Sequence, residues 1–163
     1  MTSGRLALAG AAVMTAVLTL TSPGCGDGAT PCTDCPPLEG RYRMGFAGDA
    51  GVGGDCATLG VALPRDKPLN IARTGDRLTG TLEGVSLTGS VSGQGTFSLA
   101  GTLAGGTDGG RTDTLSLAGR YTPSVADGGT AQLAGTYTGT FSRTGPSGPQ
   151  RCNVVSPFSA TRE

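Results

Sequence analysis

The sequence predicts an all-β fold: a small antiparallel up-and-down β-barrel of about eight short, glycine-rich strands, preceded by a signal peptide and a flexible tether. The phrase Leu-x-Gly-x-apolar recurs along the chain, with apolar residues at every second position. Glycine-rich turn signals separate these phrases at roughly 8–12-residue spacing, as in antiparallel all-β domains. After Leu20, every window with an apolar stripe at helical spacing also contains Gly or Pro.

The N-terminal segment is typical of an export signal. Arg5 supplies a positive charge, and an uncharged apolar run follows from Leu6 to Leu20. This run suits the core of a signal peptide and is shorter than the ~20 residues that span a bilayer. We therefore expect residues 1–24 to be a signal peptide and the mature protein to be exported.

The residues that end this run, Ser22-Pro23-Gly24-Cys25, resemble the lipobox of bacterial lipoproteins. In that family the cysteine thiol receives a diacylglycerol, cleavage occurs directly before the cysteine, and the new amine is acylated, commonly with palmitate. The resemblance implies a lipid anchor on Cys25 and a place in the bacterial cell envelope. It departs from the family pattern at Ser22, where Leu is usual, and at Pro23. The alternative is secretion without an anchor, with Ser22 and Gly24 as small residues for a general signal peptidase.

The residues after Cys25 predict a flexible tether and indicate which bacterial membrane holds the protein. Residues 25–37 are mostly Gly, Asp, Thr, Pro and Cys, which is typical of a flexible linker, and residues 38–163 form the expected barrel domain. In some bacteria an Asp directly after the lipidated cysteine retains a lipoprotein at the inner membrane. Because Asp27 lies one position later, we expect the outer membrane rather than the inner membrane.

The cysteine count supports lipidation of Cys25. Five cysteines are an odd number for an exported protein, and a lipidated Cys25 leaves four, an even set for an oxidising compartment. Of the three possible pairings, we expect Cys32–Cys35 within the tether and Cys56–Cys152 across the domain. Crossed pairs, which would fasten the tether to the barrel, stay open.

The C-x-x-C spacing of Cys32 and Cys35 also occurs in redox and zinc sites. Pro36 and Pro37 follow directly, so no helix begins there to lower a thiol pKa. Zinc would need further ligands at regular spacing. A structural disulfide is the expected outcome.

The repeated phrase locates the strands. It begins at Leu38, Leu78, Leu87, Leu99, Leu117 and Leu133, and Tyr137 begins a seventh copy. The expected strand segments are 40–47, 56–63, 68–74, 77–82, 85–91, 96–103, 114–121, 131–141 and 151–161. Because an up-and-down antiparallel barrel closes with an even number of strands, we expect eight, with one segment outside the barrel or two forming one bent strand.

The glycine inside each phrase shares the apolar face of its strand. Without a Cβ the strand can coil sharply, which lets the sheet close on itself. Alternatively, the glycine leaves room for a large side chain such as Tyr42, Phe97 or Tyr137. We expect the apolar face to lie inside, because a transmembrane barrel needs strands of ~9–11 residues and aromatic girdles, whereas this chain has seven aromatic residues in all.

The short glycine-rich strands and the opening Leu38-Glu-Gly-Arg-Tyr42 resemble the calycin barrels, the lipocalin and avidin-like folds, whose first strand carries Gly-x-Trp. Leu133-Ala-Gly-Thr-Tyr137 is similar in character to avidin strands. Tyr42 stands where that family has Trp, and the chain contains no Trp to line a biotin pocket. Biotin binding is therefore not expected.

Composition argues against catalysis, cofactors and metals. The chain has no His, and its single Lys, Lys67, lies in a predicted turn where its charge is solvated. Six acidic residues are predicted to lie in glycine-rich turns, which favour Asp through hydrogen bonds to its own backbone; they are Asp49, Asp55, Asp76, Asp108, Asp113 and Asp127. Residues 48–55 and 107–113 match a calcium loop only loosely. With 12 basic and 12 acidic residues, no nucleic-acid partner is expected.

Two function classes remain. The first is a non-catalytic, membrane-anchored envelope lipoprotein that acts as a structural or protein-interaction module. The second is a carrier that binds a small apolar ligand inside the barrel, with lining residues such as Tyr42, Phe46, Phe97 and Leu117. An eight-stranded barrel can be filled by side chains or can hold one small ligand. A lined cavity of ~300 Å³ or more would favour the carrier.

Overall fold

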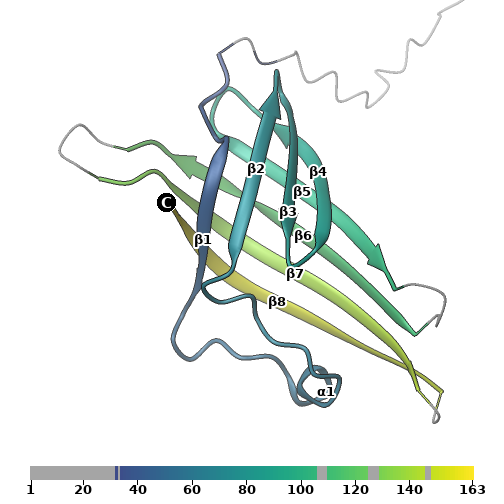
Figure 1. Cartoon of the computed structure of the whole chain (residues 1–163). Coiled ribbons are helices and arrows are strands. Elements are labelled where there is room, and N and C mark those ends of the chain that lie inside the picture. Colours follow the sequence, from purple (N-terminus) through teal and green to yellow (C-terminus); the bar gives the residue numbers. More distant parts are fainter. Residues whose placement is uncertain (1–31, 33, 106–109, 125–128, 146–147) are drawn as a thin grey trace, which may run out of the picture.

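A computed structural model describes residue 32 and residues 34–105, 110–124, 129–145 and 148–163. Eight antiparallel strands follow one another in chain order around a closed barrel, which confirms the predicted fold class and strand number (Figure 1). The strands are β1 (Gly40–Phe46), β2 (Pro68–Thr74), β3 (Arg77–Leu82), β4 (Val85–Val91), β5 (Thr96–Ala104), β6 (Arg111–Thr122), β7 (Gln132–Gly145) and β8 (Gly148–Arg162). The expected signal peptide, Cys25 and Asp27 lie outside the described residues.

The barrel has two ends, which we name after the residues found there. The α1 end carries the loop 47–67, which contains the short helix α1 (Gly54–Thr58), and the turn between β3 and β4. The Leu38 end carries the segment 34–39, the β2–β3 and β4–β5 turns and the C-terminus. Figure 1 shows α1 at the bottom and the β2–β3 turn at the top.

The prediction of a strand at 56–63 is wrong, because these residues form the end of α1 and a loop outside the barrel. Cys56 and Leu59 lie three positions apart, so one helical turn directs both toward the barrel, where Cys56 is buried and Leu59 packs against the core. Asp55 lies in the first turn of α1, where a negative charge is favoured. The remaining expected segments agree with strands, but β6 and β8 each begin three residues earlier than expected and β7 ends four residues later.

The barrel closes between its first and last strands over a short stretch. β1 pairs with β8 from Tyr42↔Arg162 to Phe46↔Phe158, and residues 148–157 of β8 pair with β7 alone. The loop 47–67 lies beside this stretch of β8, and a disulfide joins Cys56 to Cys152 there, with a Cα–Cα distance of 5.2 Å. The expected pairing across the domain is confirmed.

The apolar side chains point into the barrel, as expected. Burial alternates along the strands, for example in β4, where Val85, Leu87 and Val91 are buried and the intervening Ser and Thr side chains are exposed. Outward positions on β4–β7 carry mostly Ser, Thr and Ala. Val155 on β8 is an exposed large apolar residue, with 70% of its surface accessible. The barrel interior is therefore the hydrophobic core.

The inward-facing glycines allow close backbone approach. A Cβ added to Gly89 would lie 1.8 Å from the carbonyl oxygen of Ser98, and one added to Gly101 would lie 2.0 Å from that of Ser86. At these positions the neighbouring strand itself occupies the space, which supports sharp coiling of the sheet. Gly139 differs, because a Cβ there would meet the Phe141 ring and the Tyr137 hydroxyl. Both roles expected for the glycines therefore occur, at different positions.

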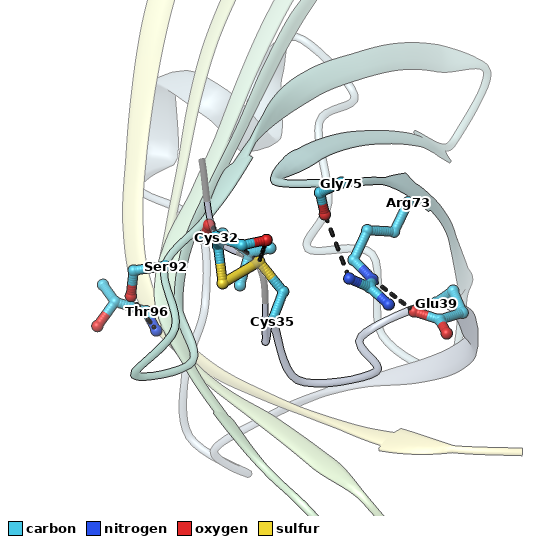
Figure 2. Close-up of a disulfide and its surroundings, with 8 residues drawn as sticks. Cys32, Cys35, Glu39, Arg73, Gly75, Ser92 and Thr96 are labelled. Atoms are coloured by element: carbon cyan, nitrogen blue, oxygen red, sulfur yellow. Dashed lines mark hydrogen bonds and ion pairs between the residues drawn. A yellow bond between two sulfur atoms is a disulfide. The ribbon is translucent and has the colours of Figure 1, made fainter. Parts of the chain in front are cut away.

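The segment that leads into β1 packs against the Leu38 end. The Cys32–Cys35 disulfide is confirmed, with a Cα–Cα distance of 5.3 Å, and Figure 2 shows it between the β4–β5 turn and the Glu39–Arg73 pair. The Cys35 Sγ lies 3.8 Å from the carbonyl oxygen of Val91. Ordered contacts with the barrel thus begin before Leu38, the expected first residue of the domain.

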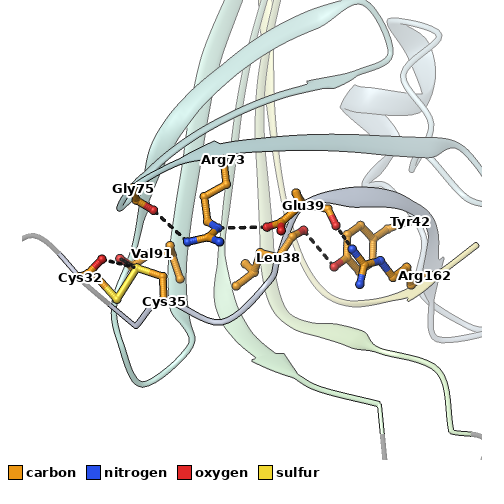
Figure 3. A network of polar contacts seen from close by, with 9 residues as sticks. All are labelled: Cys32, Cys35, Leu38, Glu39, Tyr42, Arg73, Gly75, Val91 and Arg162. Carbon is orange, nitrogen blue, oxygen red and sulfur yellow. Dashed lines mark hydrogen bonds and ion pairs between the residues drawn. A yellow bond between two sulfur atoms is a disulfide. The ribbon is translucent and has the colours of Figure 1, made fainter.

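Leu38 is fully buried at this end and is held by a polar network (Figure 3). The Tyr42 hydroxyl donates to the Leu38 carbonyl at 3.0 Å, and Arg162 donates to the Glu39 carbonyl while its guanidinium lies 5.9 Å from the centre of the Tyr42 ring. Arg73 Nε donates to the Glu39 carboxylate at 3.0 Å. A hydrogen bond to its own backbone and the bond from Arg73 lower the pKa of Glu39. The network closes the Leu38 end.

Candidate ligand-binding pocket

A pocket of about 410 Å³ lies at the α1 end. The loop after α1, strands β6 and β7, and the β3–β4 turn with the start of β4 each contribute lining residues. Its lining residues are Leu59, Gly60, Val61, Ala62, Leu63, Pro64, Lys67, Glu83, Val85, Arg111, Asp113, Leu115, Tyr137, Phe141 and Arg143. The volume lies within the range of ligand-binding cavities, roughly 300–1,000 Å³.

The loop wall is held in place from both sides. Arg65 donates to the carbonyl oxygens of Phe46 at 2.9 Å and Ala47 at 2.7 Å, and also to that of Ala50. On the other side the Cys56–Cys152 disulfide ties the loop to β8. The pocket wall is therefore preformed rather than assembled by a ligand.

The strand wall continues the inward-facing positions of β6 and β7 up to the mouth. Leu115, Asp113 and Arg111 occupy alternate positions of β6 and pair across the sheet with Gly139, Phe141 and Arg143. Apolar side chains thus lie deeper and charged side chains lie at the rim. Two arginines face each other directly across the ladder, an arrangement that is unfavourable for like charges unless a counter-charge lies between them.

Asp113 provides that counter-charge. Arg143 Nη1 donates to its Oδ1 at 2.5 Å, and Arg111 Nε donates to its Oδ2 at 2.7 Å. The Asp113 side chain is only 4% exposed, whereas the Arg111 side chain is 53% exposed. Burial of a carboxylate requires such partners, because an unpaired buried charge is strongly destabilising.

Tyr137 forms part of the apolar floor. Its ring meets that of Phe46 edge-on, with centroids 5.6 Å apart and an interplanar angle of 86°. Burial, and after it the nearby charges of Asp113 and Glu83, raise the pKa of Tyr137. Its hydroxyl therefore stays protonated and can donate a hydrogen bond to a ligand.

Lys67 and Glu83 complete the rim. The Lys67 Nζ lies 3.7 Å from Glu83 Oε1, and both side chains are about half exposed. The lining residues therefore contain three cations, Lys67, Arg111 and Arg143, and two anions, Glu83 and Asp113. One positive charge is left over at the mouth of the pocket.

The four residues expected to line a ligand cavity belong to the core or pack against it. Tyr42, Phe97 and Leu117 are buried in the core, and Phe46 is partly buried against it. None of the four lines the 410 Å³ pocket. The cavity therefore lies closer to the α1 end than the sequence-based choice of residues implied.

The charged residues of the pocket were not expected from the sequence. The prediction that Asp113 lies in a turn is wrong, because it lies inside β6, buried and paired with two arginines. The alternation along each strand does indicate that these side chains point inward. Arg111 and Asp113 lie at every second position before Leu115, and Arg143 continues the alternate positions of Tyr137 and Phe141. Asp108 and Asp127 lie outside the described residues.

In the described part of the chain, no group of three or more His, Cys, Asp or Glu residues is placed to hold a metal ion. No helix among the described residues is long and apolar enough to cross a membrane.

Comparisons of the chain with protein-family models, with curated proteins and with solved structures found no significant match. The residues that line the pocket are therefore the basis for inferring its ligand.

Proposed function

We propose that this protein is a non-catalytic binding module that holds one small, partly apolar molecule in the pocket at the α1 end of its barrel. The observation that carries the proposal is the pocket itself: about 410 Å³, with an apolar floor and a loop wall fixed by a disulfide. A concave, largely preformed site with a few convergent polar groups is typical of small-molecule sites.

The test is saturable binding of N-phenylnaphthylamine, an uncharged fluorescent probe, to the full chain carrying Cys25→Ser. That substitution removes the expected lipid anchor, which would itself bind the probe. Val85→Phe places a ring in the pocket and should abolish binding. The matched control is Val155→Phe, the same change on the outer wall, which should leave binding unchanged.

Failure of the probe to bind the wild-type pocket, or equal binding by Val85→Phe, would refute the proposal. The remaining interpretation would then be the structural or protein-interaction module, for which the pocket is incidental. Hydrolytic or redox turnover that depends on Lys67 or on an acidic residue would contradict the non-catalytic part of the proposal.

We further propose that the module is attached to the bacterial envelope, preferentially at the outer membrane, through lipid on Cys25. The support is the resemblance of residues 22–25 to a lipobox and the two disulfides, which pair the other four cysteines and leave Cys25 as the fifth. Several acyl chains exceed the two signals that stable anchoring needs. Intact-mass analysis of the membrane fraction should give a chain that begins at Cys25 and carries acyl groups. A detergent-free soluble mature chain would contradict it.

A further inference from the structure

The pocket rim carries N–H groups that donate to no acceptor among the described residues. Among the described residues, Asp113 and the Ser142 carbonyl accept from Nη1 of Arg143, and no hydrogen bond uses its Nε or Nη2. Arg111 donates to Asp113 through Nε and Nη2, and no acceptor in the described part of the chain uses its Nη1. Both guanidinium groups line the pocket, so each offers unused N–H groups to a ligand there.

The charges of the rim favour an anion. Asp113 neutralises one of the two arginines, and Glu83 lies beside Lys67, which leaves one unit of positive charge. A cationic ligand would meet this surplus, and Asp113 already accepts bonds at both of its oxygens. Guanidinium forks bind carboxylates in a geometry that a neutral head group cannot reproduce.

The depth of the residues sets the orientation of such a ligand. Arg111 and Arg143 pair at the outer end of the ladder, and Leu115 lies four positions further in than Arg111. Val85, Phe141 and Tyr137 add apolar floor below the rim. An apolar body would therefore lie inside, while its head group stays at the partly exposed arginines.

We propose that the pocket selects an amphipathic monoanion, a small apolar carboxylic acid, whose carboxylate binds Arg111 and Arg143 and whose body packs on Val85, Leu115 and Phe141. Tyr137 lines the same pocket, and its hydroxyl is a neutral donor. This inference rests on the proposed function and adds the chemical class of the ligand.

Two probes with one skeleton test the charge preference. Anilinonaphthalene sulfonate is N-phenylnaphthylamine with a single anionic group added. On the full chain carrying Cys25→Ser, we expect the anionic probe to bind at least about tenfold more tightly than the neutral one, and octanoate to displace it better than octanol. Arg143→Gln, which keeps a similar size, should remove this preference, so that the variant binds the two probes with affinities within about twofold of each other. A variant that still binds the anionic probe about tenfold more tightly would contradict the role of Arg143.

A second variant moves the charge in the opposite direction. Asp113→Asn raises the surplus to two positive charges, so the anionic probe should bind more tightly and the neutral probe should not. A purely structural role for Asp113 predicts that both probes weaken together, which would overturn the inference.

The outcomes separate the two proposals. Equal binding of both probes, still blocked by Val85→Phe, would overturn the anion selectivity and leave the proposed function standing. Absence of binding by either probe would overturn both.

Discussion

Arg111 and Arg143 lie directly opposite each other on β6 and β7, and both guanidinium groups bind the carboxylate of Asp113 between them. A barrel that needed only stability would fill these inward positions with apolar side chains, because buried ion pairs seldom exceed such packing in stability. The arrangement is therefore better explained by what it presents to the pocket.

The first prediction concerns this triad. Asp113→Asn leaves two facing arginines without a counter-charge and should lower the free energy of unfolding by about 2–3 kcal/mol, less than for a fully buried pair because Arg111 is half exposed. Replacing all three residues with Leu should give a chain at least as stable as wild type. Urea unfolding measures both; a triple variant much less stable than Asp113→Asn would show that the triad is structural.

The second prediction compares the disulfides. Cys56 and Cys152 are 96 positions apart, so Cys56→Ser with Cys152→Ser should cost up to about 4–5 kcal/mol on the chain-entropy model. Cys32 and Cys35 are 3 positions apart, and removing that bridge should cost about 2 kcal/mol at most. Denaturant unfolding of each double variant tests this order. The reverse order would mean that the N-terminal segment, not the loop at the α1 end, is the more important constraint.

The third prediction concerns the inward glycines. Gly101→Ala would place a Cβ 2.0 Å from the Ser86 carbonyl oxygen, so the barrel should lose about 3 kcal/mol or more, or fail to close. Gly51 has open space around it, and Gly51→Ala should change stability by no more than about 1 kcal/mol. Thermal unfolding of the two variants provides the comparison. Equal stability would show that the strands at Gly101 can separate without cost.

The fourth prediction is a loss of stability at high pH. Burial raises the pKa of Tyr42 to about 12 from its usual 10.0. The unfolded state then ionises first, so the stabilisation is complete below pH 10 and is lost as the pH rises toward 12. Thermal unfolding from about pH 9 to about pH 12 should show a decline that is smaller in Tyr42→Phe. Identical slopes for the two proteins would contradict a buried, shifted Tyr42.

The barrel could be predicted from the sequence because the patterns that indicate its strands and turns are local. The phrases beginning at Leu78, Leu87 and Leu117 each combine a period of 2 with a glycine, and turn signals separate them. The segment 56–63 could not be predicted in this way, because α1 is too short to carry a periodic signal. Its conformation follows from tertiary contacts, the Cys56–Cys152 bridge and the burial of Leu59.

The pocket was less predictable than the fold. Asp113 follows a glycine-rich stretch, where turns favour Asp through local hydrogen bonds. Its burial depends on Arg143, which lies 30 positions away, and no local pattern joins the two residues. The residues expected to line a cavity belong to the core (Tyr42, Phe97 and Leu117) or pack against it (Phe46), because large apolar side chains mark a core and a ligand pocket alike.

The most direct test of the central claim is native mass spectrometry of the full chain isolated from the membranes of its own host. We expect a chain that retains one non-covalent ligand, released on activation and detected as an anion. Val85→Phe should lose this ligand, and Val155→Phe should keep it. A wild-type chain without a ligand, or the same ligand retained by Val85→Phe, would contradict a binding function for the pocket.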